Sequence, residues 1–492
     1  MTMSRRHWAA VATTFMVVVV VAMLLQYSRA MALRYSGLSE PPARPLSPLV
    51  EPVLIDLEER TFRFFWDTAN PKNGLVPDRY PTPSFASVAA VGFGLTSYAI
   101  GAERGYVTRK DARKRVLTTL RFLWNAPQGT ATSGMTGYQG FYYHFLDMQG
   151  GARYQTVELS TIDTALLLGG VLFCQQYFDG PGADEVAIRA YADSIYRRVD
   201  WRWIQPRAPL VAMGWTPEEG FHSYDWRGYD EAMLLYILAL GSPTYAIADS
   251  AWSAWASSYT WGTWYGQTHI GFAPLFGHQY SQLWIDFRGI QDAYTRAHGL
   301  DYFENSRRAT YAQQAYARAN PNGWTGYSDS LWGLSASDGP GDFTLMIGGR
   351  LRTFFGYAAR GTDFTEVRDD GTITPTATGG SVPFAPDITI PALESMRRSF
   401  GGALFSTYGF FDAFNLTLPA SATPPAGRML PGVGWVDVDY LGIDEGPLLA
   451  MIENYRSELV WRYMRRSPYI VAGLRRAGFT GGWLAAAART SP

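Results

Sequence analysis

The chain has 492 residues and a nearly balanced charge, with 42 basic residues, 43 acidic residues and a formal net charge of -1. This balance gives no electrostatic reason to expect nucleic acid as a partner, and the length suffices for one large domain or two smaller ones. The 17 Trp, 30 Tyr and 27 Phe residues are many for a soluble protein. Several stand in polar, Gly-containing stretches, which indicates an aromatic-lined cleft.

The sequence gives little support for a metal or phosphate site. It contains no CxxC pair, no HExxH motif and no Gly-rich phosphate loop, and its six His residues are scattered. The single cysteine, Cys174, lies in the apolar run ALLLGGVLFCQQ, so we expect a buried helix residue without a disulfide. We therefore expect no metal and no cofactor.

The N-terminal segment predicts export. Charged residues at positions 5–7 precede an apolar run from about 8 to 25, and Ser-Arg-Ala at 28–30 is a candidate cleavage site. The run is long for a signal peptide and at the short limit for a membrane span. Residues 1–30 thus predict either a cleaved signal peptide or an inner-membrane anchor through residues 8–25, with the remainder in the periplasm.

A Pro-rich tether over residues 31–52 leads into a predicted globular domain of residues 53–480, which is followed by a tail of residues 481–492. The domain opens with LIDLEERTFRFFWDTAN, whose apolar spacing predicts an amphipathic helix. Further helices are predicted over Ser84–Arg104, Thr108–Asn125, Glu158–Tyr177, Ala183–Val199, Asp230–Leu240, Tyr245–Tyr259, Gln282–His298, Tyr302–Ala319, Ile390–Phe400 and Pro447–Arg466.

Few strands compete with these helices. Residues 361–386 predict an exposed loop or a small β excursion, and residues 419–431 predict another surface loop. The pattern favours an all-α fold, an (α/α)6 toroid with irregular loop insertions, in which outer helices wrap inner ones and the connecting loops form a cup. A helical bundle with one long loop region is the competing fold.

The stretch from Gly214 to Pro243 has the composition of a sugar-binding cleft, because aromatic faces stack on pyranose rings while carboxyl groups transfer protons. Asp230 and Glu231 precede an apolar helix, where either could act in catalysis or cap the helix. The candidate substrate-binding residues of its loop are Trp215, His222, Tyr224, Trp226, Arg227 and Tyr229.

Two other acidic positions lie near helix entrances. Asp163 is embedded among apolar residues in ELSTIDTALLL, where an unpaired carboxylate would be costly, so it should face a partner or a cavity. In GIDEGP, Pro447 suits a first helical turn, so Asp444 or Glu445 could be the cap. Helix entrances can share one rim of a toroid, and glycosidic hydrolysis needs one protonated and one ionised carboxyl group.

Two aromatic stretches, at residues 277–292 and 322–341, supply further binding candidates. For the first, an aromatic core face with an Asp286 to Arg288 charge pair is the alternative reading. Single histidines such as His144 and His269 are expected to be structural. The candidates are His278, Tyr280, Trp284, Asp286, Arg288, Tyr327, Trp332 and Asp338.

Four motifs in order, STIDTALLLGG, GYDEAMLLYILALGSP, GHQYSQLWIDFRGIQD and GIDEGPLLAMIENYRS, resemble the bacterial glucoamylase-like domain of glycoside hydrolase family 144. The resemblance runs from about Val53 to Leu474. It implies an (α/α)6 toroid that degrades β-1,2-glucan, mostly by endo action that releases sophorooligosaccharides, with some exo-acting members. A similar domain in cyclic β-1,2-glucan synthases performs transglycosylation.

The resemblance also implies roles for three acids. Glu231 matches the family's candidate general acid and Asp444 its candidate general base, with inversion at the anomeric centre, while Asp163 would position substrate or control a pKa. The chain departs from the family pattern at Asp230, where Asn is commoner, and at Glu445, where Gln is common. A noncatalytic glucan-binding envelope protein is the alternative of another class.

Overall fold

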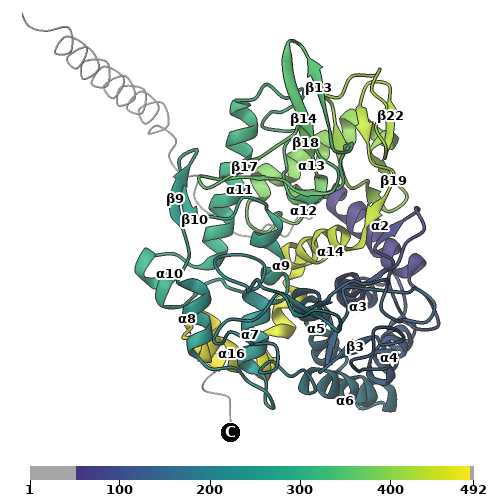
Figure 1. Ribbon diagram of the computed structural model, residues 1–492, viewed down its shortest axis with the longest axis vertical. Coiled ribbons are helices and arrows are strands. Elements are labelled where there is room, and N and C mark those ends of the chain that lie inside the picture. The colour runs from purple at the N-terminus through teal and green to yellow at the C-terminus, as the bar shows by residue number, and fades with distance from the viewer. Residues whose placement is uncertain (1–50, 488–492) are drawn as a thin grey trace, which may run out of the picture. The chain divides into compact units, whose positions relative to one another are not determined.

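Figure 1 shows the computed structural model, which describes residues 51–487. The predicted signal or anchor segment lies outside the described residues, as do nearly all of the tether and the end of the tail. Among residues 51–487, no helix is both long and apolar enough to cross a membrane.

Over the described residues, helices alternate along the chain between an outer layer and an inner ring. Around the ring α3 packs against α5, α5 against α7, α7 against α9, α12 against α14, and α14 back against α3. Gln279 of α9 closes the remaining gap, because its amide donates to the Ala377 carbonyl of α12 at 2.7 Å. This closure confirms the (α/α)6 toroid rather than a bundle. The inner helices are α3 (Val88–Arg104), α5 (Thr161–Tyr177), α7 (Met233–Gly241), α9 (Phe276–Trp284), α12 (Pro375–Gly379) and α14 (Gly442–Ser457).

The outer helices precede their inner partners in the chain. The first has the predicted amphipathic face, with Leu54, Leu57, Phe62 and Phe65 buried. In contrast, every residue of the inner helix α7 is buried, which explains its wholly apolar sequence MLLYILALG. The outer helices are α2 (Pro52–Thr68), α4 (Arg109–Asn125), α6 (Ala183–Arg197), α8 (Ser250–Ala256), α11 (Tyr302–Ala319) and α13 (Pro386–Phe400); α10 (Ala293–His298), α15 (Leu459–Met464), α16 (Pro468–Arg476), α17 (Gly482–Ala487) and the 3-10 turn η1 (Gly401–Ala403) are additional.

The inner helices α3 and α5 approach each other backbone to backbone. A Cβ atom added at Gly170 would lie 2.0 Å from the Gly92 carbonyl oxygen, so no larger residue fits at this crossing. Cys174, in the same helix as Gly170, is buried and free, as expected, and its thiol donates to the Leu95 carbonyl at 3.2 Å. Glycine in the apolar run ALLLGGVLFCQQ is thus needed for the close packing of the inner helices α3 and α5.

Two predicted helices are wrong as single elements. Residues 282–298 divide into α9 and α10, because Ile285 is extended and a new capping box forms between Asp292 and Thr295. Residues 447–466 divide into α14 and α15 at Glu458, whose φ is 57°. Moreover, α14 begins at Gly442, so Pro447 lies inside it.

The short strands lie in the loops that join the helices. The largest sheet has the order β18-β21-β23-β22, and β6-β7-β8 form a second. The strands are β1 (Arg79–Tyr80), β2 (Ala86–Ser87), β3 (Gly137–Tyr138), β4 (Phe141–Tyr142), β5 (Phe145–Leu146), β6 (Leu159–Ser160), β7 (Gly214–Thr216), β8 (Gly220–Phe221), β9 (Trp261–Trp264), β10 (Gln267–Ile270), β11 (Ile290–Gln291), β12 (Ala336–Ser337), β13 (Phe343–Ile347), β14 (Arg350–Phe354), β15 (Ala358–Ala359), β16 (Gly361–Thr362), β17 (Val367–Arg368), β18 (Thr372–Ile373), β19 (Phe405–Ser406), β20 (Gly409–Phe410), β21 (Phe414–Asn415), β22 (Arg428–Leu430), β23 (Gly434–Val436), β24 (Tyr440–Leu441) and β25 (Thr480–Gly481).

The prediction of an exposed loop over residues 361–386 is largely wrong. Residues 370–385 are all buried and contain the inner helix α12, although the predicted β excursion is present in β16 to β18. Thr and Gly suit this position because threonine hydroxyls can bond nearby carbonyls, as Thr378 does to Trp332 at 2.8 Å. The surface location of residues 419–431 is confirmed, and this segment includes β22.

Candidate active site

The predicted carboxylates meet at the N-terminal ends of the inner helices. Asp163 lies in the first turn of α5, Glu231 just before α7, and Asp444 in the first turn of α14. The charge of Asp163 acts on Glu231, and the charges of both Asp444 and Glu231 raise the pKa of Tyr280, whose main shift comes from burial. Tyr280 of α9 is therefore close enough to both predicted catalytic acids for their charges to act on it.

The Glu231 side chain is half-buried and has the properties of a proton donor. Burial raises the pKa of Glu231 to about 7, its own backbone N–H opposes the shift, and the Asp163 charge adds to it. A carboxyl with this pKa keeps its proton near neutral pH, although an isolated glutamic acid would lose it.

Asp230 and Ser281 fix the backbone on either side of Glu231. The Asp230 carboxyl accepts a hydrogen bond from the Ala232 N–H at 2.9 Å, and the Ser281 hydroxyl donates to the Glu231 carbonyl at 2.8 Å. The same hydroxyl accepts from the Leu234 N–H at 2.9 Å, which satisfies a free donor of the first turn of α7. Neither acid is the N-cap of α7, which is Ala232 without a side-chain cap, although Asp230 bonds the Ala232 N–H; no side chain among the described residues bonds the Glu231 carboxyl.

Asp444 belongs to an acidic group formed by Asp78, Asp338, Asp412, Asp437 and Asp444. Neither Asp444 nor Glu445 caps α14, contrary to the prediction, because the N-cap residue is Leu441 and both acids lie in the first turn. Burial raises the pKa of Asp444 to about 8; hydrogen bonding with Asp412 opposes this shift, while the Asp338 and Asp78 charges support it. One oxygen of the Asp444 carboxyl is buried without a hydrogen-bond partner.

Short strands bring the members of the acidic group together. Phe414 of β21 pairs with Val436 of β23, which places the preceding Asp412 beside the following Asp437. In the same way β12 pairs with β15, so that Asp338 comes next to the loop residue Tyr357. β1 pairs with β24 and brings Asp78 to the entrance of α14.

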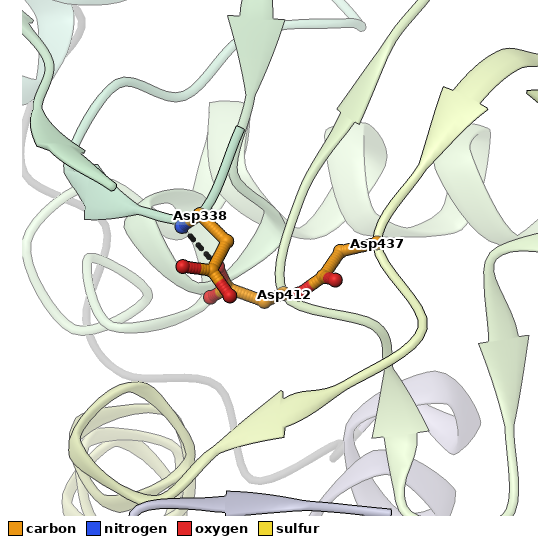
Figure 2. Close-up of side chains that lie close together, drawn as sticks. All are labelled: Asp338, Asp412 and Asp437. Atoms are coloured by element: carbon orange, nitrogen blue, oxygen red, sulfur yellow. Dashed lines mark hydrogen bonds between the residues drawn. The ribbon is translucent and has the colours of Figure 1, made fainter. Parts of the chain in front are cut away.

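Figure 2 shows Asp338, Asp412 and Asp437 facing one another. One oxygen from each lies within 4.8 Å of the others, and this is the only such group of metal-ligand type among residues 51–487. These three carboxylates could hold a divalent cation, which prefers oxygen ligands, or accept hydrogen bonds from sugar hydroxyls. Arg79 is the cation paired with the group, at 2.5 Å from Asp338 and 3.3 Å from Asp78.

Mutual repulsion adds to burial within the acidic group. Burial raises the pKa of Asp412 well above its usual range, and the charges of Asp444, Asp338 and Asp437 raise it further. Burial, with the charges of Asp338 and Asp439, also raises the pKa of Asp437 to about 7. The acidic group therefore keeps some of its carboxyl groups protonated near neutral pH. The carboxylates that remain ionised can accept a proton.

The sequence reasoning missed Asp78, Asp412, Asp437 and Tyr357. Asp412 stands in GFFDAF, where a single acid among aromatic residues could have been noticed, but nothing local relates it to Asp444. Tyr357 is 56% exposed, and the charges of Asp444 and Asp412 act on its hydroxyl. Its ring is thus an exposed aromatic face beside the carboxylates, suited to stacking on a sugar.

Several predicted binding residues pack in the core instead. Trp284 stacks on Phe93 at 5.3 Å and donates to Thr96 at 3.1 Å. The motif that contains Trp284, residues 277–292, covers almost all of the inner helix α9. Only the N-terminal end of that motif can therefore reach the cleft. The predicted residues found buried in the core are Trp226, Tyr229, His278, Trp284 and Trp332.

Asp286 and Arg288 are also not at the site. They follow the C-terminal end of α9 and pair with each other at 2.8 Å, as the alternative reading proposed. Arg288 further pairs with Glu458, which follows α14, at 2.9 Å. The pair therefore stabilises the opposite end of the ring. Tyr327 is buried, and its hydroxyl donates to Asp369 at 2.7 Å.

The remaining candidates lie on the loop around β7 and β8. Trp215 pairs with Leu159 of β6, just before Asp163, and packs against Tyr138 at 5.3 Å. Arg227 is exposed, His222 is half-buried and Tyr224 is 73% exposed. Trp215 itself is buried, so on the β6-β7-β8 side only His222, Tyr224 and Arg227 of these candidates present surface to a ligand.

Comparison with known proteins places the chain among glucan-degrading enzymes. The Glycoamylase family profile matches residues 223–468. A crystal structure of a glucoamylase-class protein from Bacteroides uniformis is 31% identical, with a TM-score of 0.75, over 89% of this chain and 99% of that one. An endo-β-1,2-glucanase from Chitinophaga pinensis, solved with sophorotriose and glucose, is 27% identical, with a TM-score of 0.74, over 89% of this chain and 100% of that one.

A curated relative shows a second mode of action. The exo β-1,2-glucooligosaccharide sophorohydrolase of Parabacteroides distasonis, which acts at the non-reducing end, is 29% identical over 90% of this chain. The chain spans 60% of the length of that relative.

Proposed function

The chain belongs to the bacterial glucoamylase-like family, the group of glycoside hydrolase family 144, and from this premise we propose that it hydrolyses β-1,2-glucan and releases sophorooligosaccharides. The observation that carries the proposal is Glu231, a free, half-buried carboxyl with a pKa of about 7, whose charge acts on Tyr280 as that of Asp444 in the acidic group does. One protonated and one ionised carboxyl are what glycosidic hydrolysis requires.

Glu231 would protonate the leaving glycosidic oxygen as the bond breaks. Asp444, with Asp412 beside it, would accept the proton of the attacking water, directly or through a relay. Because Asp412 and Asp444 hydrogen-bond to each other and both have raised pKa values, one can stay protonated while the other is ionised and acts as the base. Water that attacks opposite the leaving group inverts the anomeric centre.

A substrate panel tests the proposal. Purified protein is incubated with linear β-1,2-glucan, β-1,3-glucan and soluble starch, and reducing ends are counted over time. We expect reducing ends from β-1,2-glucan alone. Starch cleavage without β-1,2-glucan cleavage would contradict the substrate assignment, and saturable β-1,2-glucan binding without any reducing ends would support the noncatalytic alternative.

Endo action is the mode we propose, because the chain is similar over its length to the Chitinophaga pinensis endo-enzyme. The Parabacteroides distasonis exo-enzyme is the specific reason to keep exo action as a second candidate. Product length separates them, since endo action gives a ladder of sophorooligosaccharides at early times and exo action gives one short product. NMR of the first product's anomer separates hydrolytic inversion from retaining transglycosylation.

Export to the periplasm is likewise a proposal, and its support is the charged and apolar pattern of residues 5–25. Fractionation of cells that express the full chain tests it. Activity in the periplasmic fraction would indicate a cleaved signal peptide, activity in the inner-membrane fraction would indicate an anchor, and activity in the cytoplasm alone would contradict export.

A further inference from the structure

His144, expected from the sequence to be structural, lies between two carboxylates at the wall of the candidate site. Its Nδ1 is 2.8 Å from the Glu158 carboxylate, and its Nε2 is 3.5 Å from the Asp163 carboxylate. The ring is fixed in place, because it stacks on Phe145 at 3.9 Å and its backbone N–H donates to the Glu158 carbonyl at 2.9 Å.

Both ring nitrogens thus face a carboxylate, Glu158 at hydrogen-bond distance and Asp163 at ion-pair distance. A neutral imidazole has one N–H and one acceptor nitrogen, so it could donate to only one carboxylate and would point a lone pair at the other. An imidazolium donates to both. Burial alone lowers the pKa of His144, but the charges of Asp163 and Glu158, with a smaller effect from Asp78, outweigh it and raise the pKa to about 9.

Asp163 connects this ring to the proposed general acid. Its Oδ2 accepts from the Ser160 hydroxyl at 2.5 Å and is the oxygen that faces His144, while its buried position allows little contact with water. It is also the charged neighbour whose effect raises the pKa of Glu231. A change in the charge or orientation of Asp163 is therefore transmitted to Glu231.

We propose that His144 is a positioning residue: a doubly protonated imidazolium, oriented by Glu158, that holds Asp163 as a fixed negative charge beside the Glu231 carboxyl. His144 itself touches neither substrate nor reacting atoms. The inference rests on the proposed function, since it assigns His144 a part in keeping Glu231 ready to donate its proton.

The first test is the pH profile of kcat/KM on β-1,2-glucan for wild type and His144→Gln. Without the imidazolium, the Asp163 carboxylate loses its charged neighbour and is no longer held beside the Glu231 carboxyl. The alkaline limb, which reports loss of the Glu231 proton, should move to lower pH by about one unit, and kcat/KM at pH 8 should fall by about tenfold. Glu158→Gln should give a smaller shift in the same direction, because it removes one carboxylate that favours the protonated His144 ring but keeps the ring itself.

The second test reads the ring directly and does not depend on activity. In full-length protein with 15N-labelled histidine, the His144 signals, identified by their absence in His144→Gln, should show both nitrogens protonated at pH 7.5. In Asp163→Asn the same ring should lose its proton at a lower pH. His298→Gln, a change at an exposed histidine whose Nδ1–H donates to the Tyr294 carbonyl at 3.0 Å, is the matched control for both tests.

The outcomes separate the two proposals. If wild type releases no reducing ends, the proposed function fails, whereas the NMR result still decides the state of His144. If wild type is active and the alkaline limb of a folded His144→Gln is unchanged, the positioning role is wrong. If His144→Gln does not fold, Glu158→Gln and the wild-type NMR signals carry the test, and a neutral His144 ring at pH 7.5 overturns the proposal.

Discussion

The backbone N–H of Asp338 donates to the Asp412 carboxylate at 2.8 Å, which ties the loop after β12 to the start of β21. This contact orients Asp412 while its other oxygen stays buried and unpartnered within the acidic group. An unpartnered buried carboxylate oxygen is costly unless a ligand or a proton compensates it. The relationship places Asp412 beside Asp444 as part of the proposed base.

Asp412→Asn tests this placement. The amide can still accept from the Asp338 N–H, so the loop should stay in place, but the charge is removed. We expect kcat to fall by about 10²- to 10⁴-fold, the usual range for general acid–base groups, with little change in Tm. Initial rates on β-1,2-glucan and a thermal melt measure both, and a variant with wild-type kcat would exclude Asp412 from the base.

The pH dependence of the wild-type enzyme gives a second prediction. A general acid must be protonated to act, and the pKa of Glu231 is raised to about 7, first by burial and then by the Asp163 charge. Activity should therefore decline as the pH rises through about 7, and kcat/KM reports this value for the free enzyme. A kcat/KM that is flat from pH 6 to 9 would contradict Glu231 as the acid.

The two departures from the family pattern are explained by burial. Burial raises the pKa of Asp230, with help from Glu231, and raises the pKa of Glu445 well above its usual range, with Thr61 opposing and Asp444 adding to the shift. Both acids thus favour the neutral form far more than free carboxyl groups do. A protonated Asp or Glu has nearly the shape of the Asn or Gln that is commoner there, so the double variant Asp230→Asn/Glu445→Gln should retain most activity.

The same double variant should change the pH dependence of stability. A carboxyl whose pKa is raised on folding binds its proton more tightly in the folded state, so wild type loses stability as the pH rises above the unfolded pKa of about 4, until the folded pKa is passed. The amides do not titrate. Melts from pH 5 to 9 should show a Tm difference in favour of the variant that grows with pH. A constant difference, or one like that of the exposed control Glu219→Gln, would show that these acids are ionised in the folded protein.

The buried ion pair of Arg360 and Asp370 stabilises the backbone at Asp338, a member of the acidic group. Arg360 and Asp370 are both fully buried and pair at 2.8 Å, and Arg360 also donates to the Asp338 carbonyl at 3.3 Å. Asp370→Asn should destabilise the protein by about 3 to 5 kcal/mol, because it leaves the buried guanidinium uncompensated. Denaturant unfolding measures this, with the surface change Asp329→Asn as control. A loss below about 1 kcal/mol would show that water reaches the pair.

The helical order and the three catalytic candidates could be predicted from the sequence, because apolar periodicity and acids at helix entrances are local signals. Glu231 and Asp444 gather at one rim because inner helices of a toroid enter the ring from the same side. The inner helix α12 could not be predicted, since its five residues, PTATG, are helical only because the ring surrounds them.

The aromatic candidates show the other limit of the sequence. Trp284 and Tyr280 are one helical turn apart in α9, and both pack on Phe93 in the core, which local composition could not distinguish from a cleft lining. Asp412 and His144 were missed for a related reason. Each becomes informative only through a partner distant in sequence or on another element, Asp444 for the first and Asp163 for the second.

The most direct measurement is kcat on linear β-1,2-glucan for Glu231→Gln, compared with Glu219→Gln, an equivalent loss of charge at an exposed site in the same loop. The substitution removes the transferable proton of Glu231 and little of its volume. We expect Glu231→Gln to lower kcat by about 10²- to 10⁴-fold while Glu219→Gln stays near wild type. A folded Glu231→Gln that turns over β-1,2-glucan at the wild-type rate would contradict the central role of Glu231.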